Sequence, residues 1–186
     1  MPETIYFARP GPDNTDDTIA AVARRALELD ISTVVVASHE GRVGLQVAST
    51  MKGLSVVVVT HSSGYKEPNT QQLPDEIRRE LQEMGAQVLT CHHAFAGINY
   101  AVRKRFGTYL PDDYIAHTLR LFGVGVKVAV EVSLMAASAG LIRTDREIIS
   151  IAGTGKGADT ALVLQPTTVH KFFDLRVKEI ICKPRL

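Results

Sequence analysis

Short runs of apolar, largely β-branched residues recur along the chain, at 33–37, 55–59, 86–89 and 148–152. These runs scarcely alternate with polar positions. Strands covered on both faces, as in a parallel sheet, show this continuous pattern, whereas half-exposed strands alternate. We therefore predict four buried strands. Residues 5–7 form a shorter apolar run, which is typical of an edge strand.

Between these strands the apolar positions follow helical spacing. Ile19, Val22 and Ala26 share one face of a predicted helix over about 15–30. Further helices are predicted at 43–51, 74–84, 111–122 and 123–139. Strands and helices alternating at this interval predict an α/β fold, a three-layer sandwich with a mostly parallel sheet covered by helices.

Three other segments have distinct patterns. Residues 160–164 are apolar and follow the last buried strand closely, and residues 174–182 alternate as a terminal strand would. Residues 94–110 show no clear period, and a long loop in a compact domain is usually functional or disordered. The run Arg103-Lys104-Arg105 within it is typical of a solvated face, with capture of an anion as the alternative.

Length and composition narrow the class of protein. The 186 residues are most simply one domain, 1–186, and a formal net charge of +1 gives no support to nucleic-acid binding. The longest apolar segment, 123–142, is interrupted by Lys127 and Glu131, so it predicts a buried helix rather than a membrane span. The N-terminus lacks a signal-peptide pattern and the two cysteines form no disulfide framework, so we expect a cytoplasmic protein.

A glycine-rich segment, Gly153-Thr154-Gly155-Lys156-Gly157, connects the strands at 148–152 and 160–164. Its glycines let backbone N–H groups turn toward a ligand, while Lys156 adds a positive charge and Thr154 a hydroxyl. The combination favours a phosphate site, and a hairpin whose glycines serve only the turn is the alternative. A Walker A loop is excluded because the segment lacks its first glycine and its final Ser or Thr, and a dinucleotide fingerprint is excluded because no helix follows.

The polar loops follow the predicted strands and should meet on one edge of the sheet, where open α/β sheets bind ligands. These loops are residues 38–42, 60–64, 90–97 and 153–160. Four of the six histidines lie in the first three of them, namely His39, His61, His92 and His93. Contacts to a phosphate or a flavin are one interpretation of this group. Metal ligation is the other, but carboxylate or cysteine ligands in consistent geometry are lacking, so we predict no metal site.

Other polar residues have a structural and a functional interpretation. Asp159 is suited to hydrogen-bond a sugar or ribityl hydroxyl, or to stabilise its own loop, and the two remain open. Lys127 and Glu131 on an apolar helix favour a structural pair. Cys91 has no identified activating base, so a cysteine nucleophile is unsupported. No catalytic residue can be assigned from the spacing.

Two segments resemble the C-terminal α/β domain of pyruvate kinases: residues 33–51, a strand, loop and helix, and residues 148–159, a strand and glycine loop. Nearly the whole chain resembles, more closely, a small and largely archaeal family of stand-alone proteins with the same fold. The shared motifs are Arg9–Thr15, Val35–Ser38, Val59–His61, Glu131–Ala137 and Gly157–Leu164.

In pyruvate kinases this domain binds phosphorylated effectors in the loops that match 38–42 and 153–157, whereas the catalytic chemistry belongs to a separate barrel. The resemblance therefore implies phosphate binding here, without phosphotransfer to pyruvate. Members of the stand-alone family are seen with flavin mononucleotide (FMN), so the resemblance implies FMN as the cofactor. His39 and Glu40 stand where the pyruvate kinase loop has Ser and Thr hydroxyls.

We accordingly predict a cytoplasmic protein that binds a phosphorylated small molecule, most specifically FMN, and not nucleic acid or membrane. The alternative is an enzyme that uses a flavin or acts on a phosphorylated metabolite, with His61 or His92 as acid and base. The apolar helices and the terminal strand predict a homo-oligomer. The predicted ligand contacts are Ser38, His39, Gly41, Thr60, His61, His92, Gly153, Thr154, Gly155, Lys156, Gly157, Asp159 and Thr160.

Overall fold

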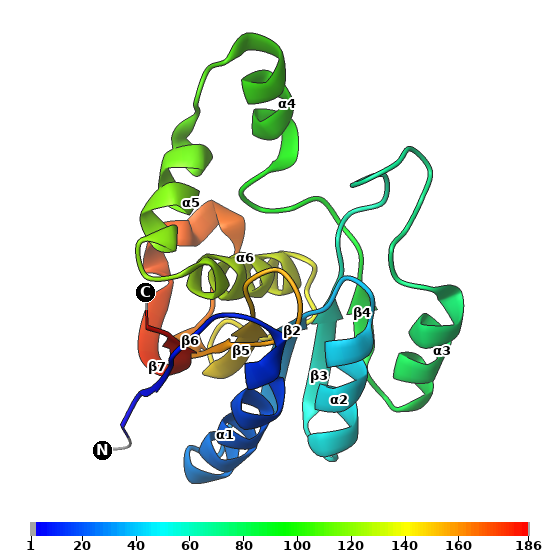
Figure 1. The fold of residues 1–186 in the computed structure, drawn as a ribbon, viewed down its shortest axis with the longest axis vertical. Helices are drawn as coiled ribbons and strands as arrows, with labels where there is room; N and C mark the ends of the chain where they lie inside the picture. The colour runs from blue at the N-terminus through cyan, green and yellow to red at the C-terminus, as the bar shows by residue number, and fades with distance from the viewer. Residues whose placement is uncertain (1–2, 186) are drawn as a thin grey trace.

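A computed structural model describes residues 3–185, which form one mixed sheet with helices on both faces (Figure 1). The strands are β1 (Ile5–Phe7), β2 (Thr33–Ala37), β3 (Ser55–Val59), β4 (Gln87–Leu89), β5 (Ile148–Ala152), β6 (Thr160–Gln165) and β7 (Arg176–Pro184). The helices are α1 (Thr15–Glu28), α2 (Arg42–Thr50), α3 (Asp75–Glu83), α4 (Gly97–Phe106), α5 (Pro111–Arg120) and α6 (Val124–Ser138), with 3-10 turns η1 (Pro12–Asn14) and η2 (Val169–Asp174). The predicted α/β fold is confirmed.

The strand order is β1-β7-β6-β5-β2-β3-β4. Neighbours β1/β7, β5/β2, β2/β3 and β3/β4 are parallel, so the sheet is mostly parallel as predicted. Strand β6 runs antiparallel to both β5 and β7. The loop 153–159 between β5 and β6 is too short for a crossover helix, so the two strands form a hairpin. Strand β7 lies inside the sheet, whereas β1 is an edge strand as predicted.

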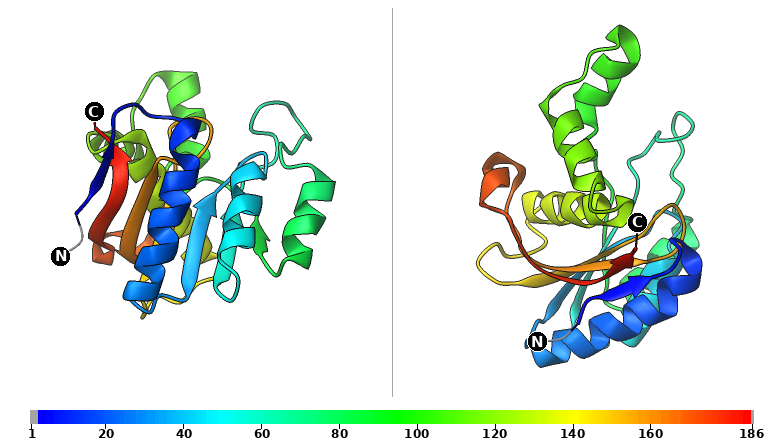
Figure 2. Two further views of the ribbon diagram at one scale, coloured as in Figure 1. Left: turned by 60° about the horizontal axis from the view of Figure 1, so that its bottom comes forward. Right: turned by 60° about the vertical axis from the view of Figure 1, so that its left-hand side comes forward.

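Each central strand contributes apolar side chains to two cores. Val34 and Val36 face α1, α2 and α3, while Val35 between them faces α6 on the other side. The three layers are visible in Figure 2, where α1, α2 and α3 cover one face of the sheet. This double burial explains why the strand sequences are continuously apolar.

Helix α6 is the central helix of the second layer and is buried along nearly its whole length. The Ser150 hydroxyl on β5 donates to the Ala129 carbonyl at 2.8 Å and so links the sheet to this helix. Lys127 and Glu131 form an ion pair one helical turn apart, as expected. Within residues 3–185, no helix has the length and apolar character needed to cross a membrane.

The segment 94–110, which showed no period, contains a helix, so the expectation of a loop was wrong. Helix α4 buries none of its residues, and it therefore lacks the apolar stripe by which a sequence reveals a helix. With α5 it forms an arm that projects from the body (Figures 1 and 2). Arg103 pairs with buried Asp113 and lies 5.2 Å from the centre of the Tyr100 ring, so this arginine holds the two helices together.

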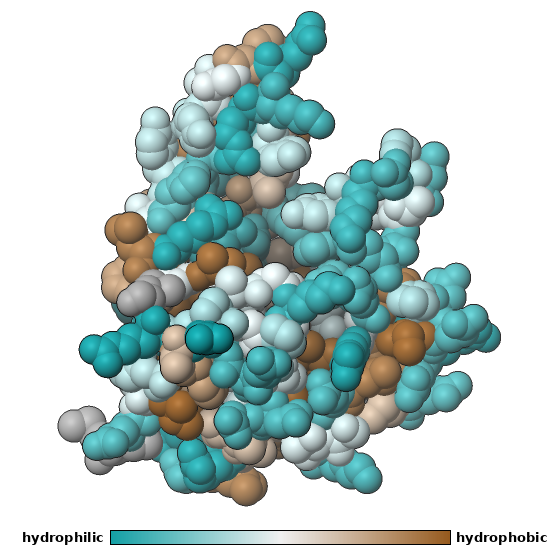
Figure 3. Space-filling view, in the orientation of Figure 1, coloured by the Kyte–Doolittle hydropathy of each residue, from teal (hydrophilic) through white to brown (hydrophobic). Residues whose placement is uncertain are grey.

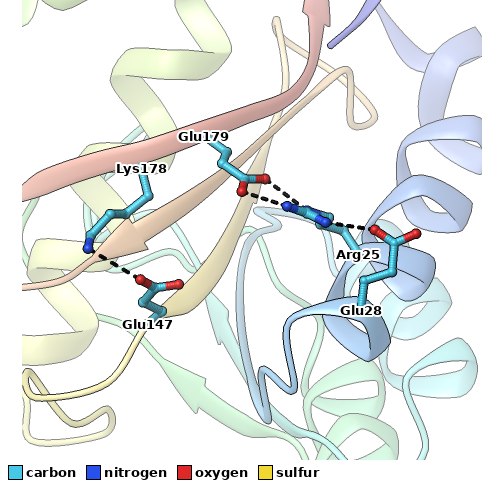
Figure 4. Close-up of polar contacts among 5 residues, drawn as sticks. All are labelled: Arg25, Glu28, Glu147, Lys178 and Glu179. Atoms are coloured by element: carbon cyan, nitrogen blue, oxygen red, sulfur yellow. Dashed lines mark hydrogen bonds and ion pairs between the residues drawn. The ribbon is translucent and has the colours of Figure 1, made fainter. Parts of the chain in front are cut away.

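Helix α1 is fixed to the C-terminal strand by a forked contact (Figure 4). The Arg25 guanidinium donates through Nε and Nη2 to the two carboxylate oxygens of Glu179 on β7, at 2.8 and 2.6 Å. It also donates to Glu28 one turn further along α1. Lys178 on the same strand pairs with Glu147 at 3.3 Å.

The carboxylate of Asp159 connects three separate pieces of backbone. It accepts hydrogen bonds from the Gly11 amide at 3.0 Å, the Thr154 amide at 3.1 Å and the Thr160 hydroxyl at 2.7 Å. The side chain is fully buried, so these donors replace the water it has lost. The N-terminal segment, the glycine loop and β6 therefore have fixed relative positions.

Substitutions of the Arg25–Glu179 pair test the anchoring of α1. We expect Glu179→Gln to lower the free energy of unfolding by about 1 kcal/mol at pH 7, because a forked but partly exposed pair is lost. The Arg25 hydrogen bond lowers the pKa of Glu179 from its usual 4.5, so this contribution exists above that pH and is lost as pH falls through the folded-state pKa. Urea unfolding at pH 7 and pH 3 should show the difference shrinking in acid, with Glu28→Gln as the control. An equal deficit at both pH values contradicts this account.

Removing the Asp159 carboxylate tests whether it holds the three segments together. We expect Asp159→Ala to lower the free energy of unfolding by roughly 3 kcal/mol or more, because three donors lose a charged acceptor in the interior. The exposed Asp174→Ala variant is the control. Hydrogen exchange should report faster exchange of the Gly11 and Thr154 amides in Asp159→Ala. Unchanged protection of both would show that other contacts hold the segments.

The predicted homo-oligomer is best tested on the arm, where Ile98 and Phe106 are 82% and 72% exposed. Large exposed apolar side chains on helices that bury few residues favour contact with a second copy of the chain. We expect light scattering to find a dimer or larger species, and Phe106→Ser to shift it toward monomer. Phe173→Ser, which removes an equally exposed phenylalanine from η2, is the matched control. A monomer at every working concentration would contradict the prediction.

Candidate functional site

A cavity of about 770 Å³ lies where the carboxyl ends of β2, β3 and β5 meet. Its wall contains the loops after those strands, residues 12–16, the first turns of α2 and one side of α6. The predicted polar loops therefore converge on one edge of the sheet, as the parallel topology requires. The surface in Figure 3 is mostly hydrophilic and is notched between the arm and the loop 60–73.

The backbone conformation and close packing of the glycine loop at this edge require its glycines. Gly155 and Gly157 have φ of +82° and +74°, which favour glycine. A Cβ on Gly157 would lie 2.3 Å from Pro12 Cα, and one on Gly153 would lie 2.4 Å from the Gly157 carbonyl oxygen. Turn geometry and packing thus account for all three. The same loop also presents Gly153, Gly155, Lys156 and Gly157 to the cavity.

Only part of the loop backbone is available to a ligand. The Thr154 amide donates to Asp159, and the Ala158 amide donates to the Thr15 hydroxyl at 3.1 Å. The amides of residues 155–157 make no hydrogen bond to another described residue. Together with exposed Lys156, these three amides form the positively polarised part of the loop.

The next part of the wall is the start of α2. Ser38 accepts a hydrogen bond from the Gly44 amide at 3.1 Å and so satisfies one of the first-turn donors of this helix. Gly41 precedes the helix with φ of +89°, packed so closely that a Cβ would lie 2.3 Å from Ile77 Cγ2. Arg42, the first helical residue, lines the cavity at the positive end of the helix dipole.

Four rings, His39, His61, Tyr65 and His93, form a contiguous group that we call the aromatic wall. His61 is central, with its ring centre 4.9 Å from that of His39, 4.1 Å from that of Tyr65 and 5.3 Å from that of His93. The His39 and His61 rings are nearly parallel, at 11°. All four residues line the cavity and give it an aromatic surface.

Burial keeps the outer histidines of this wall uncharged. It is the main reason that the pKa of His39 lies below its usual 6.5, and the neighbouring His61 lowers that pKa further, because two adjacent imidazoles do not readily carry charge together. Burial likewise lowers the pKa of His93, with the Glu131 carboxylate acting in the opposite direction. Both rings are therefore predominantly neutral at pH 7 and accept protons less readily than an exposed histidine.

The Lys127–Glu131 pair lines the cavity from the α6 side. Glu131 Oε2 accepts from Lys127 Nζ, and Glu131 Oε1 accepts from the Phe95 amide at 3.0 Å. Lys127 Nζ also lies 5.6 Å from the centre of the Phe95 ring. The carboxylate has a partner on each oxygen, so the pair positions the 90–97 loop as well as contributing to the cavity.

Eight of the predicted contact residues line the cavity: Ser38, His39, Thr60, His61, Gly153, Gly155, Lys156 and Gly157. The others do not line it. Gly41 and Thr154 are held by the local contacts described above, Asp159 and Thr160 are fully buried and bond to each other, and His92 is exposed beside Gly97. Asp159 therefore stabilises its loop, one of the two interpretations left open by the sequence.

Several residues that line the cavity are not among the predicted contacts. His93 replaces its neighbour His92, and only the fold decides which of two adjacent side chains faces inward. Tyr65 lies in a polar, irregular segment, and Arg120 ends the arm helix. Pro12, Asp13 and Asp16 come from the N-terminal segment. The motif Arg9–Thr15 was a signal for the first two, and the hydrogen bond from the Gly11 amide to Asp159 holds this segment in position.

The sequence supported neither a cysteine nucleophile nor a metal site, and the structure bears on both. Burial raises the pKa of Cys91, and it raises that of Cys182 to about 11, so both thiols are poor nucleophiles at neutral pH. Within residues 3–185, no group of three or more His, Cys, Asp or Glu side chains is arranged to hold a metal ion.

Comparison with known proteins identifies the fold. Residues 16–164 match the model of the family "Pyruvate kinase, alpha/beta domain". Cryptosporidium parvum pyruvate kinase in complex with ADP is similar in structure, with a TM-score of 0.41 and 14% identity over 83% of this chain and 24% of that chain. A second crystal structure of this enzyme gives a TM-score of 0.38 and 12% identity over 77% of this chain and 22% of that chain. The chain spans about a quarter of the length of these pyruvate kinases.

The family match extends from the second residue of α1 to the fifth residue of β6 and so includes most of the cavity wall. The strands, the helices and the order in which they follow one another are those of an α/β domain. This chain belongs to the family of the pyruvate kinase alpha/beta domain.

Proposed function

We propose that this protein binds a phosphate-bearing small molecule with a planar ring, specifically FMN, in the cavity at the carboxyl ends of the strands. The observation that carries the proposal is the meeting of two surfaces in one cavity. Lys156, the amides of 155–157 and the start of α2 offer donors to a phosphate, and the aromatic wall offers a face for a ring. The proposal does not include phosphotransfer to pyruvate, because the family match concerns only the α/β domain.

The dimensions and chemistry of the cavity fit such a ligand. Pockets for small molecules usually have volumes of about 300–1,000 Å³, a range that includes the 770 Å³ found here. Val59, Val124 and Val128 add apolar surface beside the rings. Bound FMN would supply a redox-active ring; the residues of this chain would bind its phosphate and cover one ring face. Glu40, 3.6 Å from His39, restricts the phosphate to the Lys156 side of the cavity.

A second candidate is an enzyme that uses the flavin or acts on a phosphorylated metabolite. One observation favours considering it: His61 Nδ1 lies 2.7 Å from Gln72 Oε1, and a histidine oriented by a second group is a common acid and base. His92, the other histidine considered for this role, does not line the cavity. A purified protein that is yellow, bleaches with a reductant and recolours with an electron acceptor would support the enzyme.

Substitution of Lys156 tests the phosphate contact. A lysine–phosphate contact contributes on the order of 1.5–3 kcal/mol when partly buried, and Lys156 is exposed, so the lower end applies. We expect Lys156→Ala to weaken FMN binding about tenfold and to leave riboflavin, which lacks the phosphate, nearly unchanged. Quenching of flavin fluorescence measures both affinities.

Lys52→Ala is the matched control, because Lys52 is an exposed lysine beyond the other end of α2. It should leave both affinities as in the wild type. Equal losses for FMN and riboflavin in Lys156→Ala, or no loss for either, would mean that the glycine loop serves only as a turn.

A further inference from the structure

His61 is at the centre of the aromatic wall and is also held by a hydrogen bond to Gln72 of the same loop. It follows β3 and is the only histidine of the aromatic wall whose ring lies within 5.3 Å of all three other rings, centre to centre. Its ring is also fixed in its own plane by the hydrogen bond between Nδ1 and Gln72 Oε1 at 2.7 Å. His61 and Gln72 lie near opposite ends of the loop between β3 and α3, so the hydrogen bond joins the two ends of this loop.

This hydrogen bond selects one form of the neutral imidazole. An amide oxygen only accepts, so Nδ1 must carry the proton and donate it. The second nitrogen, Nε2, is then the proton acceptor of the ring. Protonation at Nε2 leaves the bond to Gln72 intact, because both nitrogens of an imidazolium are donors. His61 can therefore gain a positive charge without losing its anchor.

The surroundings of His61 accommodate a single positive charge. Tyr65, with its ring centre at 4.1 Å, presents a π-face that attracts a cation. His39 and His93 are held neutral by burial, so a charge on His61 meets no second imidazolium. The charged groups around the wall are Glu40, Lys66 and Lys156 near His39, and Lys127, Glu131 and exposed His92 near His93. On the Lys156 side there are more positive charges (Lys66 and Lys156) than negative ones (Glu40), and a bound anion would neutralise part of this excess.

We propose that His61, held by Gln72 as the tautomer protonated on Nδ1, takes up a proton at Nε2 when an anionic ligand enters the cavity. The identity of that ligand as a phosphate compound rests on the function proposed above. Binding of the anion is then coupled to uptake of about one proton, and the affinity strengthens as pH falls from 8 toward 6. Gln72 acts as a positioning residue, because it contacts the histidine and not the ligand.

The tautomer is measurable in the ligand-free protein. In ¹⁵N-histidine-labelled protein, two-dimensional NMR distinguishes the two neutral forms, and His61→Gln assigns the signals. We expect His61 with its proton on Nδ1, and Gln72→Leu to abolish that preference while Gln72→Glu restores it. Gln82→Leu, an exposed glutamine on α3, is the control. A His61 ring with its proton on Nε2 would overturn the proposal.

Inorganic phosphate then tests proton uptake. Its addition should raise the titration midpoint of His61 by about one pH unit, the size of effect expected from an opposite charge nearby, and leave that of exposed His170 unchanged. An unchanged His61 midpoint overturns proton uptake. FMN affinity, measured separately by fluorescence, distinguishes failure of the proton-uptake proposal from failure of the proposed ligand. FMN that binds without any change at His61 refutes only the proton uptake, whereas FMN that fails to bind refutes the proposed ligand.

Discussion

The buried carboxylate of Asp159 is the constraint on which the shape of the site depends. It accepts hydrogen bonds from the Gly11 amide, the Thr154 amide and the Thr160 hydroxyl, so it links the N-terminal segment to the glycine loop and the start of β6. A charged group is stable in a protein interior only when donors surround it, so the carboxylate and its donors specify one another. The position of the glycine loop against residues 11–15 follows from this contact. One wall of the cavity is therefore set by a residue that does not line it.

The sequence predicted most of the strands of the sheet. It did not predict helix α4 or the tertiary contacts of the loops that follow the strands. Continuous β-branched runs such as 33–37 identified strands because those strands are buried on both faces. Helix α4 was missed because it contacts no core that would impose a period. The sequence predicts Gly41 as a ligand contact, and Asp159 either as a ligand contact or as a support of its own loop, since polar or flexible residues in strand-exit loops suggest binding. Their neighbours in the fold, Ile77 and Gly11, are distant in sequence, and only the fold brings them together.

Charges of both signs surround the cavity, and their positions matter more than their sum. Arg42, Arg120 and Lys156 line it together with Asp13, Asp16 and Glu40. The Lys127–Glu131 pair adds no net charge. Such an arrangement gives little long-range attraction for anions, but it imposes a direction on a bound molecule. A ligand with one anionic end and one uncharged ring meets a complementary surface in one orientation and a repulsive one in the other.

The parallel pairing of β1 with β7 affects the order in which the molecule can be assembled. Ile5 pairs with Cys182, and Gly157 packs against Pro12, so residues that are far apart in this sequence lie side by side. Contacts between such distant residues form late, because a long loop of chain must close first. Strands β2, β3 and β5 can pair with one another first, whereas strand β1 has no neighbour in the sheet until β7 is in place. The edge of the sheet made by β1 and β7 is therefore expected to form only after the central strands have paired.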